Sequence, residues 1–397
     1  MSLQDTPRSN RLHIGIFGKR NSGKSSLINA LTNQDIAIVS DIAGTTTDPV
    51  YKSMEIHGIG PVVFIDTAGF DDIGEIGQLR ISQTKKAMEK TDVAIMLFTE
   101  EVEEAELQWV EELKRRQIPV IAVINKIDVI KKPEELRHSV EEKYGIPAIL
   151  VSALTKEGVE KIRQELIRAL PADFENESIT SNLVKPDDIV LLVMPQDIQA
   201  PKGRLILPQV QVIRELLDKK CIVISVTTDK LDAALNSLRQ PPKLIITDSQ
   251  VFKTVYEKKP EESMLTSFSV LLAGYKGDLG YFVEGAYTIG KLTENSRVLI
   301  AEACTHAPLE EDIGREKIPN MLRKRFGKGL RVDITAGTDF PEDLTVYDLI
   351  IHCGGCMFNR KYVLTRIERA KAAGVPMTNY GVVIAYLSGI LDKIDLP

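Results

Sequence analysis

The chain has 397 residues, too many for one ordinary domain, so two or three domains are expected. Hydrophobic residues make up 43% of the chain and charged residues 27%, which is typical of a globular protein with a sizeable core. The net charge of −6, without a long run of Lys and Arg, argues against a protein that works on nucleic acid.

Composition also disfavours secreted and membrane proteins. No apolar stretch follows residues 1–10, so we expect no secretory signal and a flexible N-terminus over those ten residues. No segment reaches the roughly 18 apolar residues of a membrane span. The four cysteines are too few for a disulfide scaffold. We therefore expect a protein of the reducing cytoplasm that binds neither membrane nor nucleic acid.

Residues 11–171 alternate short Val/Ile-rich strands with amphipathic helices, which is typical of a mostly parallel sheet covered on both faces. The predicted elements are strand Leu12–Phe17, helix Lys24–Leu31, strand Val62–Asp66, helix Ser82–Lys90, strand Val93–Phe98, helix Glu104–Arg116, strand Val120–Asn125, strand Ile149–Ser152 and a closing helix to Leu170. The sequence therefore predicts an N-terminal α/β domain.

Two smaller α/β domains, again with mostly parallel sheets, are predicted after a linker at residues 172–187 that is rich in Ser, Asn, Asp, Glu and Pro. The first covers residues 188–260, with strand Ile189–Met194, helix Gln209–Lys220, strand Cys221–Val226, helix Lys230–Leu238 and strand Lys243–Thr247. The second covers residues 261–397, with strand Thr266–Leu272, helix Tyr281–Lys291, strand Arg297–Glu302, helix Glu311–Phe326, strands Arg331–Thr335 and Tyr347–His352, and helix Arg360–Ala373.

A phosphate-binding loop lies between the first predicted strand and the first predicted helix. Residues 18–25 are Gly-Lys-Arg-Asn-Ser-Gly-Lys-Ser and fit the pattern G-x-x-x-x-G-K-[ST]. In such a loop backbone amides surround the phosphates, Lys24 contacts the β and γ oxygens, and Ser25 binds Mg²⁺. The nucleotide-binding residues predicted here are Gly18, Asn21, Ser22, Gly23, Lys24, Ser25 and Ser26.

Two further segments are candidates for sensing the γ-phosphate. Asp66-Thr67-Ala68-Gly69 ends a predicted strand, where Asp66 can reach Mg²⁺ through water and the Gly69 amide can reach the phosphate. Residues 43–48, Ala-Gly-Thr-Thr-Thr-Asp, form a candidate switch. Within it, Thr46 is the predicted Mg²⁺ ligand, with Thr45 and Thr47 as alternates.

The base is predicted to be guanine. Asn125-Lys126-Ile127-Asp128 follows a strand end, and Asp128 can accept from the guanine ring N–H and amino group, which adenine does not present. Asn125 is expected to tie neighbouring loops together and Lys126 to lie over the base. Ser152 and Ala153 are expected to close the pocket. Together with the phosphate-binding loop, these motifs predict a GTP site.

The switch segment resembles the Ala-Gly-Thr-Thr-Arg-Asp sequence of the tRNA-modifying and Era-like branch of the translation-factor-like GTPases. Phe70 stands where Ras-like proteins have the glutamine that orients water, so slow hydrolysis is expected. In this branch K⁺ neutralises charge and is held partly by an asparagine of the phosphate loop, which Asn21 matches. The resemblance implies Lys24, Asn21 and Thr46 as catalytic groups. The catalytic glutamate of the branch aligns with Gly77, so that role has no assigned residue.

Three of the four cysteines and two of the five histidines lie in two short clusters, Cys304-Thr305-His306 and His352-Cys353-Gly354-Gly355-Cys356. Thiolates gathered in this way indicate a metal site. Each cluster directly follows a predicted strand, and the carboxyl ends of parallel strands meet at one edge of a sheet, so the clusters are expected to converge. His352 and Cys353 would point to opposite faces if both continued the strand. Cys221, in contrast, is predicted to be a small buried hydrophobe.

The residues alone leave three kinds of centre open. Zinc bound by three cysteines and one histidine is a common structural site, although it usually stabilises a module that lacks its own core. An iron–sulfur cluster with three thiolates and one exchangeable position fits the Gly354-Gly355 pair, since glycines let backbone amides approach sulfides. A redox pair of cysteines is the third possibility.

A GTPase domain followed by Cys-x-His, a gap of about 45 residues and His-Cys-x-x-Cys resembles the HydF family of [FeFe]-hydrogenase maturation GTPases over nearly the whole chain. The resemblance implies GTPase, dimerisation and cluster-binding domains, with a [4Fe–4S] cluster on Cys304, Cys353 and Cys356. The fourth position of such a cluster is labile in this family. Its candidate ligands here are His306, His352 and a carboxylate of Glu310-Glu311-Asp312, of which Glu311 is favoured.

The resemblance also implies a task for the chain. It would use GTP, Mg²⁺ and K⁺ and carry a transient diiron subcluster as a homodimer, with a dimer of dimers as the larger assembly. Its partners would be the radical-SAM hydrogenase maturases and the apo-[FeFe]-hydrogenase. The alternative is an RNA- or ribosome-associated GTPase of the Era and tRNA-modification type with a structural zinc site, which the acidic charge and the lack of an aromatic–basic stripe disfavour.

Overall fold

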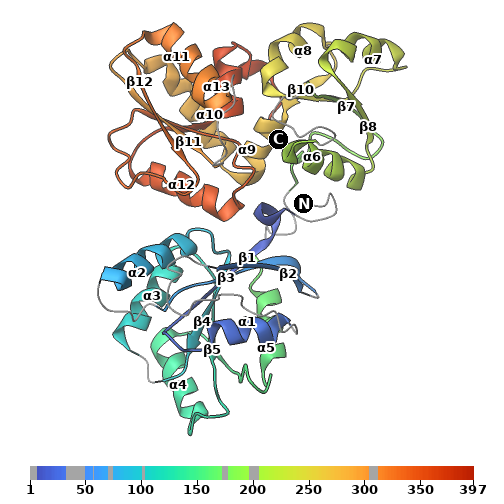
Figure 1. Ribbon diagram of the computed structural model, residues 1–397. Helices are drawn as coiled ribbons and strands as arrows, with labels where there is room; N and C mark the ends of the chain where they lie inside the picture. The colour runs from blue at the N-terminus through green and yellow to red at the C-terminus, as the bar shows by residue number, and fades with distance from the viewer. Residues whose placement is uncertain are drawn as a thin grey trace. The chain divides into compact units, whose positions relative to one another are not determined.

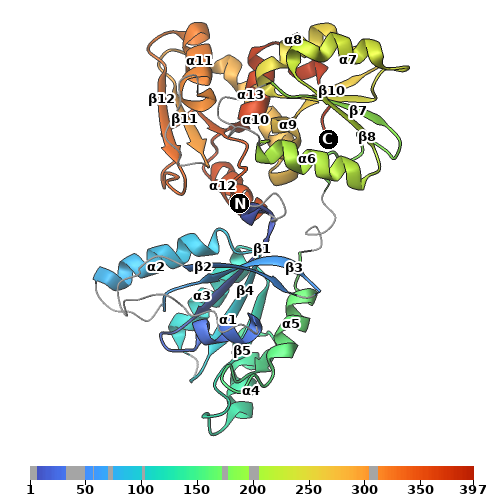
Figure 2. The same ribbon diagram turned by 45° about the vertical axis from the view of Figure 1, so that its right-hand side comes forward.

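The computed structural model describes residues 7–32, 50–56, 58–69, 75–100, 103–171, 178–195, 205–303 and 312–397 (Figures 1 and 2). The chain divides into two compact units, Met1–Asn176 and Glu177–Pro397, and each is described by itself. Within the described ranges, every helix is too short or too polar to cross a membrane.

The first unit is built on a six-stranded sheet in the order β2-β3-β1-β4-β5-β6. Its described strands are β1 (Leu12–Gly18), β2 (Val50–Ile56), β3 (Gly60–Asp66), β4 (Val93–Phe98), β5 (Val120–Ile124) and β6 (Ala148–Leu150). Its described helices are α1 (Lys24–Thr32), α2 (Glu75–Met88), α3 (Glu104–Arg115), α4 (Pro133–Tyr144) and α5 (Val159–Arg168). The edge strand β2 runs antiparallel to β3, and the other described pairs are parallel.

Helices cover both faces of this sheet, as Figure 2 shows. On one face α1 and α5 contribute Leu27 and Ile162 to a core with the strands. On the other face α2, α3 and α4 contribute Met88, Leu113 and Val140. The predicted α/β class is therefore confirmed for this unit, with β1, β4 and β5 buried between two helical layers.

The second unit contains two four-stranded sheets, in the orders β10-β9-β7-β8 and β12-β11-β13-β14, and all their described pairs are parallel. The first sheet consists of β7 (Ile189–Val193), β8 (Ile222–Val226), β9 (Leu244–Thr247) and β10 (Met264–Ser267), with α6 (Leu207–Asp218), α7 (Leu231–Ser237) and α8 (Phe252–Lys258). The second consists of β11 (Arg297–Glu302), β12 (Arg331–Ala336), β13 (Leu349–His352) and β14 (Met377–Asn379), with α9 (Phe268–Lys276), α10 (Leu279–Tyr287), α11 (Ile318–Phe326), α12 (Arg360–Ala372) and α13 (Tyr380–Leu387).

The strand predicted over Thr266–Leu272 is wrong beyond Ser267. The Ser267 hydroxyl accepts from the Val270 amide at 3.2 Å, and this side-chain cap starts helix α9. A short apolar run does not distinguish a buried strand from a buried helix by periodicity, and here the cap decides. Because β10 pairs with β9, the sheet of the domain predicted over residues 188–260 continues past residue 260.

Other predicted segments differ as well, among them the helix predicted over Ser82–Lys90, which is observed over Glu75–Met88. Residues Arg8–Asn10, within the segment expected to be flexible, form a 3₁₀ turn. The helix predicted over Tyr281–Lys291 is α10 followed by a separate 3₁₀ turn at Thr288–Lys291. The helix predicted from Glu311 begins, among the described residues, with a π-helical turn at Ile313–Lys317 before α11.

Candidate functional sites

The loop between β1 and α1 has a backbone that requires its glycines. Gly18, Asn21 and Gly23 have φ angles of 152°, 59° and 89°, which side chains other than glycine and asparagine rarely adopt. A Cβ atom at Gly23 would also lie 2.3 Å from Asn125 Nδ2. The loop is thereby held close to the segment that follows β5.

The end of this loop brings together the groups expected to contact phosphate and Mg²⁺. The Lys24 ammonium donates to the carbonyls of Gly18 at 2.9 Å and Lys19 at 2.7 Å. The Ser25 hydroxyl donates to Asp66 Oδ2 at 2.6 Å. Burial raises the pKa of Asp66, although the Ser25 hydrogen bond and the charge of Lys24 act to lower it. A serine hydroxyl beside a half-buried carboxylate is a donor set that suits Mg²⁺.

Asn125 joins three segments, as its position in the motif predicts. Its side-chain amide donates to the Ser22 carbonyl at 2.9 Å, and its side-chain oxygen accepts from the Ala153 amide at 3.0 Å. Ser152 donates through its hydroxyl to Asp128 Oδ1 at 2.6 Å, which fixes the direction of that carboxylate. The phosphate loop and both base-recognition loops are therefore held as one rigid group.

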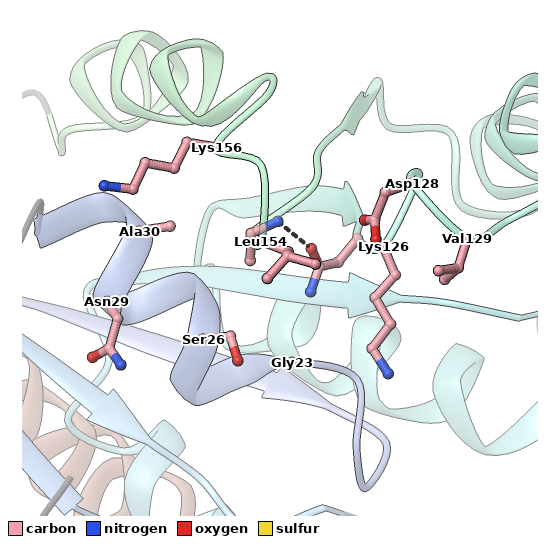
Figure 3. A pocket seen from close by; sticks show the side chains of 11 residues that line it. Gly23, Ser26, Asn29, Ala30, Lys126, Asp128, Val129, Leu154 and Lys156 are labelled. Carbon is pink, nitrogen blue, oxygen red and sulfur yellow. Dashed lines mark hydrogen bonds between the residues drawn. The ribbon is translucent and has the colours of Figure 1, made fainter. Parts of the chain in front are cut away.

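A pocket of about 550 Å³ opens between these segments. Figure 3 shows Ser26, Asn29 and Ala30 of α1 on one side and Lys126 and Asp128 on the other. Its other lining residues are Gly23, Asn125, Val129, Ala153, Leu154 and Lys156.

Leu154 and Val129 at the rim of this pocket are 81% and 70% exposed. Apolar side chains left exposed at the rim of a pocket are suited to pack against the faces of a flat ring. The pocket therefore offers both a carboxylate for an edge of a base and apolar groups for its faces.

Several predicted residues of the nucleotide site lie outside the described residues. They are Thr46 with its alternates Thr45 and Thr47, and also Phe70. Gly69 is described at the end of the segment after β3, and Gly77 lies within α2.

The second cysteine cluster follows β13, which lies beside β11 in the sheet. The Cys353 sulfur accepts from the Ala303 amide at 3.0 Å and from the Gly355 amide at 3.4 Å. Gly355 reaches its sulfur-facing position with a φ of 61°. The carboxyl ends of β11 and β13 therefore lie side by side, and the convergence of the two clusters stays a prediction. Cys304, His306 and Glu311 themselves lie outside the described residues.

The surroundings of Cys353 suit a sulfur that binds iron. Burial raises the pKa of its thiol to about 11, while the Gly355 and Ala303 amides lower it. Amide donors of this kind stabilise thiolates in iron–sulfur centres. Within the described ranges no group of three or more His, Cys, Asp or Glu side chains is placed to hold a metal ion. The described part of the donor set, Cys353 and Cys356, fits a cluster that needs a third thiolate from elsewhere.

His352 differs from its neighbour Cys353. Its side chain is 1% exposed; its Nδ1 lies 2.7 Å from the Cys353 carbonyl and its Nε2 3.1 Å from Arg366 Nη1. Burial and the charge of Arg366 lower the pKa of His352 to about 3, so the ring is neutral, with Nδ1 donating and Nε2 accepting. Both nitrogens are thus engaged, and this arrangement argues against His352 as a fourth ligand.

Two buried groups near the cysteines were not found from the sequence. Lys276, at the end of α9, is 1% exposed and donates to carbonyls of the Gly355–Phe358 segment. Glu302, at the end of β11, accepts from Arg315 Nε at 3.0 Å and from the Tyr380 hydroxyl at 3.3 Å. Neither Lys276 nor Glu302 belongs to a sequence motif, so the sequence alone does not predict their position near the cysteines.

Protein-family models match three consecutive parts of the chain. Residues 13–126 match the "50S ribosome-binding GTPase" family. Residues 179–277 match the "Hydrogen maturase F dimerization domain", and residues 280–395 match the "Hydrogen maturase F tetramerization domain". All three parts of the chain are thus matched in order.

Curated relatives resemble the first part. GTPase Der of Wolinella succinogenes is 35% identical over 45% of this chain and 41% of its own length. The tRNA modification GTPase MnmE of Chromobacterium violaceum is 36% identical over 42% of this chain and 37% of its own length. The chain thus spans about two fifths of the length of these curated relatives. A crystal structure of Aquifex aeolicus Era is 20% identical, with a TM-score of 0.36, over 54% of this chain and 92% of that one.

The dimerization and tetramerization matches are specific to one family, and they cover most of residues 179–395 behind a GTPase domain. The chain belongs to the hydrogen maturase F family, the HydF family that its cysteine and nucleotide motifs resemble.

Proposed function

We propose that this protein is a GTP-binding and GTP-hydrolysing scaffold that assembles and delivers the diiron subcluster of the [FeFe]-hydrogenase active site. It carries a [4Fe–4S] cluster on Cys304, Cys353 and Cys356. Its partners are the radical-SAM maturases and the apo-hydrogenase, and it works as a homodimer or a dimer of dimers. The observation that carries the proposal is the amide-lined Cys353 sulfur in a chain of the hydrogen maturase F family.

The nucleotide part of the proposal rests on contacts among the described residues. The Lys24 ammonium donates to two loop carbonyls, and it can donate to the β and γ oxygens of a bound nucleotide instead. Ser25 and Asp66 are hydrogen-bonded to each other, so both lie where a Mg²⁺ ion would bind. Hydrolysis is slow, since the chain has no glutamine after Gly69 to orient water. In this role GTP turnover gates partner association.

Replacing Asp128 with Asn is expected to weaken GDP binding by about 100-fold. The carboxylate is held by Ser152 at 2.6 Å and would accept two guanine hydrogen bonds, and bonds to a charged group contribute about 1.5–3 kcal/mol each. Calorimetric titration with GDP and ADP measures the effect. Ser152→Ala, which only loosens the carboxylate, should weaken binding less. Equal GDP affinity in Asp128→Asn and the unaltered protein would contradict this base assignment.

Replacing Na⁺ with K⁺ is expected to raise GTP turnover about tenfold, equivalent to about 1.4 kcal/mol of transition-state stabilisation. Asn21 would supply a side-chain oxygen to the ion. Its left-handed backbone, with φ of 59°, makes Asn21→Gly the cleaner variant, because glycine keeps that conformation while Asn21→Ala strains it. Phosphate release in the two salts measures the effect. Equal rates in Na⁺ and K⁺, or K⁺ stimulation that survives in both variants, would rule out this role.

The cluster part rests on the chemistry of the described sulfur site. Burial, two amide donors to Cys353 and a glycine pair between the cysteines suit a [4Fe–4S] centre with one exchangeable iron. Such a centre, when bound, supplies an iron site that can accept and release a cargo. Because both nitrogens of His352 are engaged, we favour His306 or a carboxylate of Glu310-Glu311-Asp312, Glu311 above all, for the fourth position.

Anaerobic reconstitution tests the proposal against its alternative. The purified chain is incubated with iron and sulfide, desalted, and assayed for iron, sulfide, zinc and visible absorption. We expect about four iron and four sulfide per chain and a brown protein. A colourless protein holding one tightly bound zinc would instead support an RNA- or ribosome-associated GTPase with a structural zinc site.

A further inference from the structure

Lys276 is a buried lysine that donates hydrogen bonds to the chain segment around Cys356. Its ammonium donates to the carbonyls of Phe358 at 2.7 Å, Gly355 at 3.2 Å and Cys356 at 3.4 Å. The side chain is 1% exposed, and lysine is rarely buried without a partner. Among the described residues that partner is a set of peptide carbonyls and not a carboxylate.

The rest of the same segment is held in a matching way. The Cys353 carbonyl lies 2.7 Å from His352 Nδ1 and accepts from Asn379 Nδ2 at 3.2 Å. Four carbonyls between residues 353 and 358 are therefore bound by side chains from β13, β14 and α9. The loop has little freedom to rearrange, although two of its six residues are glycines.

Holding the carbonyls also sets the amides. A peptide unit is planar and trans, so its N–H points away from the direction of its C=O. With the Gly355 and Cys356 carbonyls turned to Lys276, the amides of Cys356 and Met357 point away from the lysine. One further amide, that of Gly355, donates to the Cys353 sulfur at 3.4 Å. Lys276 thus fixes the two peptide units that flank Cys356.

We infer that Lys276 is a positioning residue of the cysteine site, which holds the Gly355–Phe358 backbone so that Cys353 and Cys356 are presented together to one bound cluster. The ammonium also places a positive charge beside two groups that bind iron as thiolates. The part of the inference that concerns a bound cluster rests on the proposed function. The rigidity of the loop at residues 353–358, in contrast, can be measured in the cluster-free chain.

Two variants of the full chain separate the contributions. Lys276→Met keeps the length of the side chain and removes both donor and charge, whereas Lys276→Gln keeps a shorter donor. Lys253→Met, on an exposed face of α8, is the matched control. In the cluster-free chain, amide hydrogen exchange over residues 353–359 should accelerate about tenfold or more in Lys276→Met, less in Lys276→Gln and not in the control.

After reconstitution with iron and sulfide, the same proteins are mixed with a ferrous chelator. Lys276→Met should release iron several-fold faster than the unaltered chain, with partial rescue in Lys276→Gln. Unchanged exchange over residues 353–359 would overturn the inference, and so would acceleration spread through residues 178–397, because the lysine would then serve the core. If the unaltered chain binds no iron, the proposed function fails, while the exchange result still decides the role of Lys276.

Discussion

Replacing Lys24 with Ala is expected to lower GTP turnover by a factor on the order of 10²–10³, the usual effect of removing one hydrogen-bond donor that stabilises a developing anion. The Lys24 ammonium lies inside the phosphate loop, where the Gly18 and Lys19 carbonyls accept hydrogen bonds from it. The cysteines belong to the other compact unit of the chain. We therefore expect the visible absorption of the reconstituted cluster to be the same in the variant.

Phosphate release at saturating GTP and the absorption spectrum of the same preparation measure this pair of effects. Lys132→Ala is a suitable control, since Lys132 is exposed and pairs with Glu135 on the surface of the same domain. Loss of turnover together with loss of the cluster would show that nucleotide and cluster are not independent, and would contradict a gating role for GTP.

Replacing Cys353 with Ala is expected to reduce bound iron from about four atoms per chain to less than about one. The cluster would lose a ligand, and the Ala303 and Gly355 amides would lose the sulfur that accepts from them. For the cluster-free chain this second loss should lower the free energy of unfolding by about 1–3 kcal/mol. Cys356→Ala should abolish iron binding to the same extent.

Cys221→Ala provides the matched control for these variants. Cys221 is a buried thiol that lies before β8, where it donates to the Lys185 carbonyl at 3.4 Å. Iron and sulfide analysis of the three reconstituted variants distinguishes the cysteines. A cluster that survives in Cys353→Ala, or one that is lost equally in Cys221→Ala, would exclude the proposed ligand set.

The parts of the fold that the sequence predicted are those with strong apolar patterns. Strands such as Val93–Phe98 and Arg297–Glu302 are buried runs between helices, and their observed bounds match the predicted ones. The edge strand β2 was missed because it has a single buried residue, Ile56, and hence no apolar run. Helix α4 was missed for a similar reason, since most of its residues are charged or polar.

The sites divide in the same way. The phosphate loop and the Asn125–Asp128 motif could be predicted because their chemistry requires fixed residues at fixed spacing. The surroundings of the cysteines could not, since Lys276 reaches their loop from α9, far away in sequence, and Arg366 of α12 contacts His352 only because the chain folds back. The engagement of His352 Nε2 depends on Arg366, so the ring looked available as a ligand in the sequence.

Helix α9 couples the unfolding of the two sheets in the second unit. Its Val270 and Ala273 belong to one hydrophobic cluster with strands of both sheets, while Phe268, Leu271 and Leu272 belong to another with α6. The two family matches meet just after this helix, at residues 277 and 280. Because the core crosses that boundary, the two sheets should unfold in one cooperative transition, and a fragment starting at residue 280 would expose the wall of its own core that α9 covers.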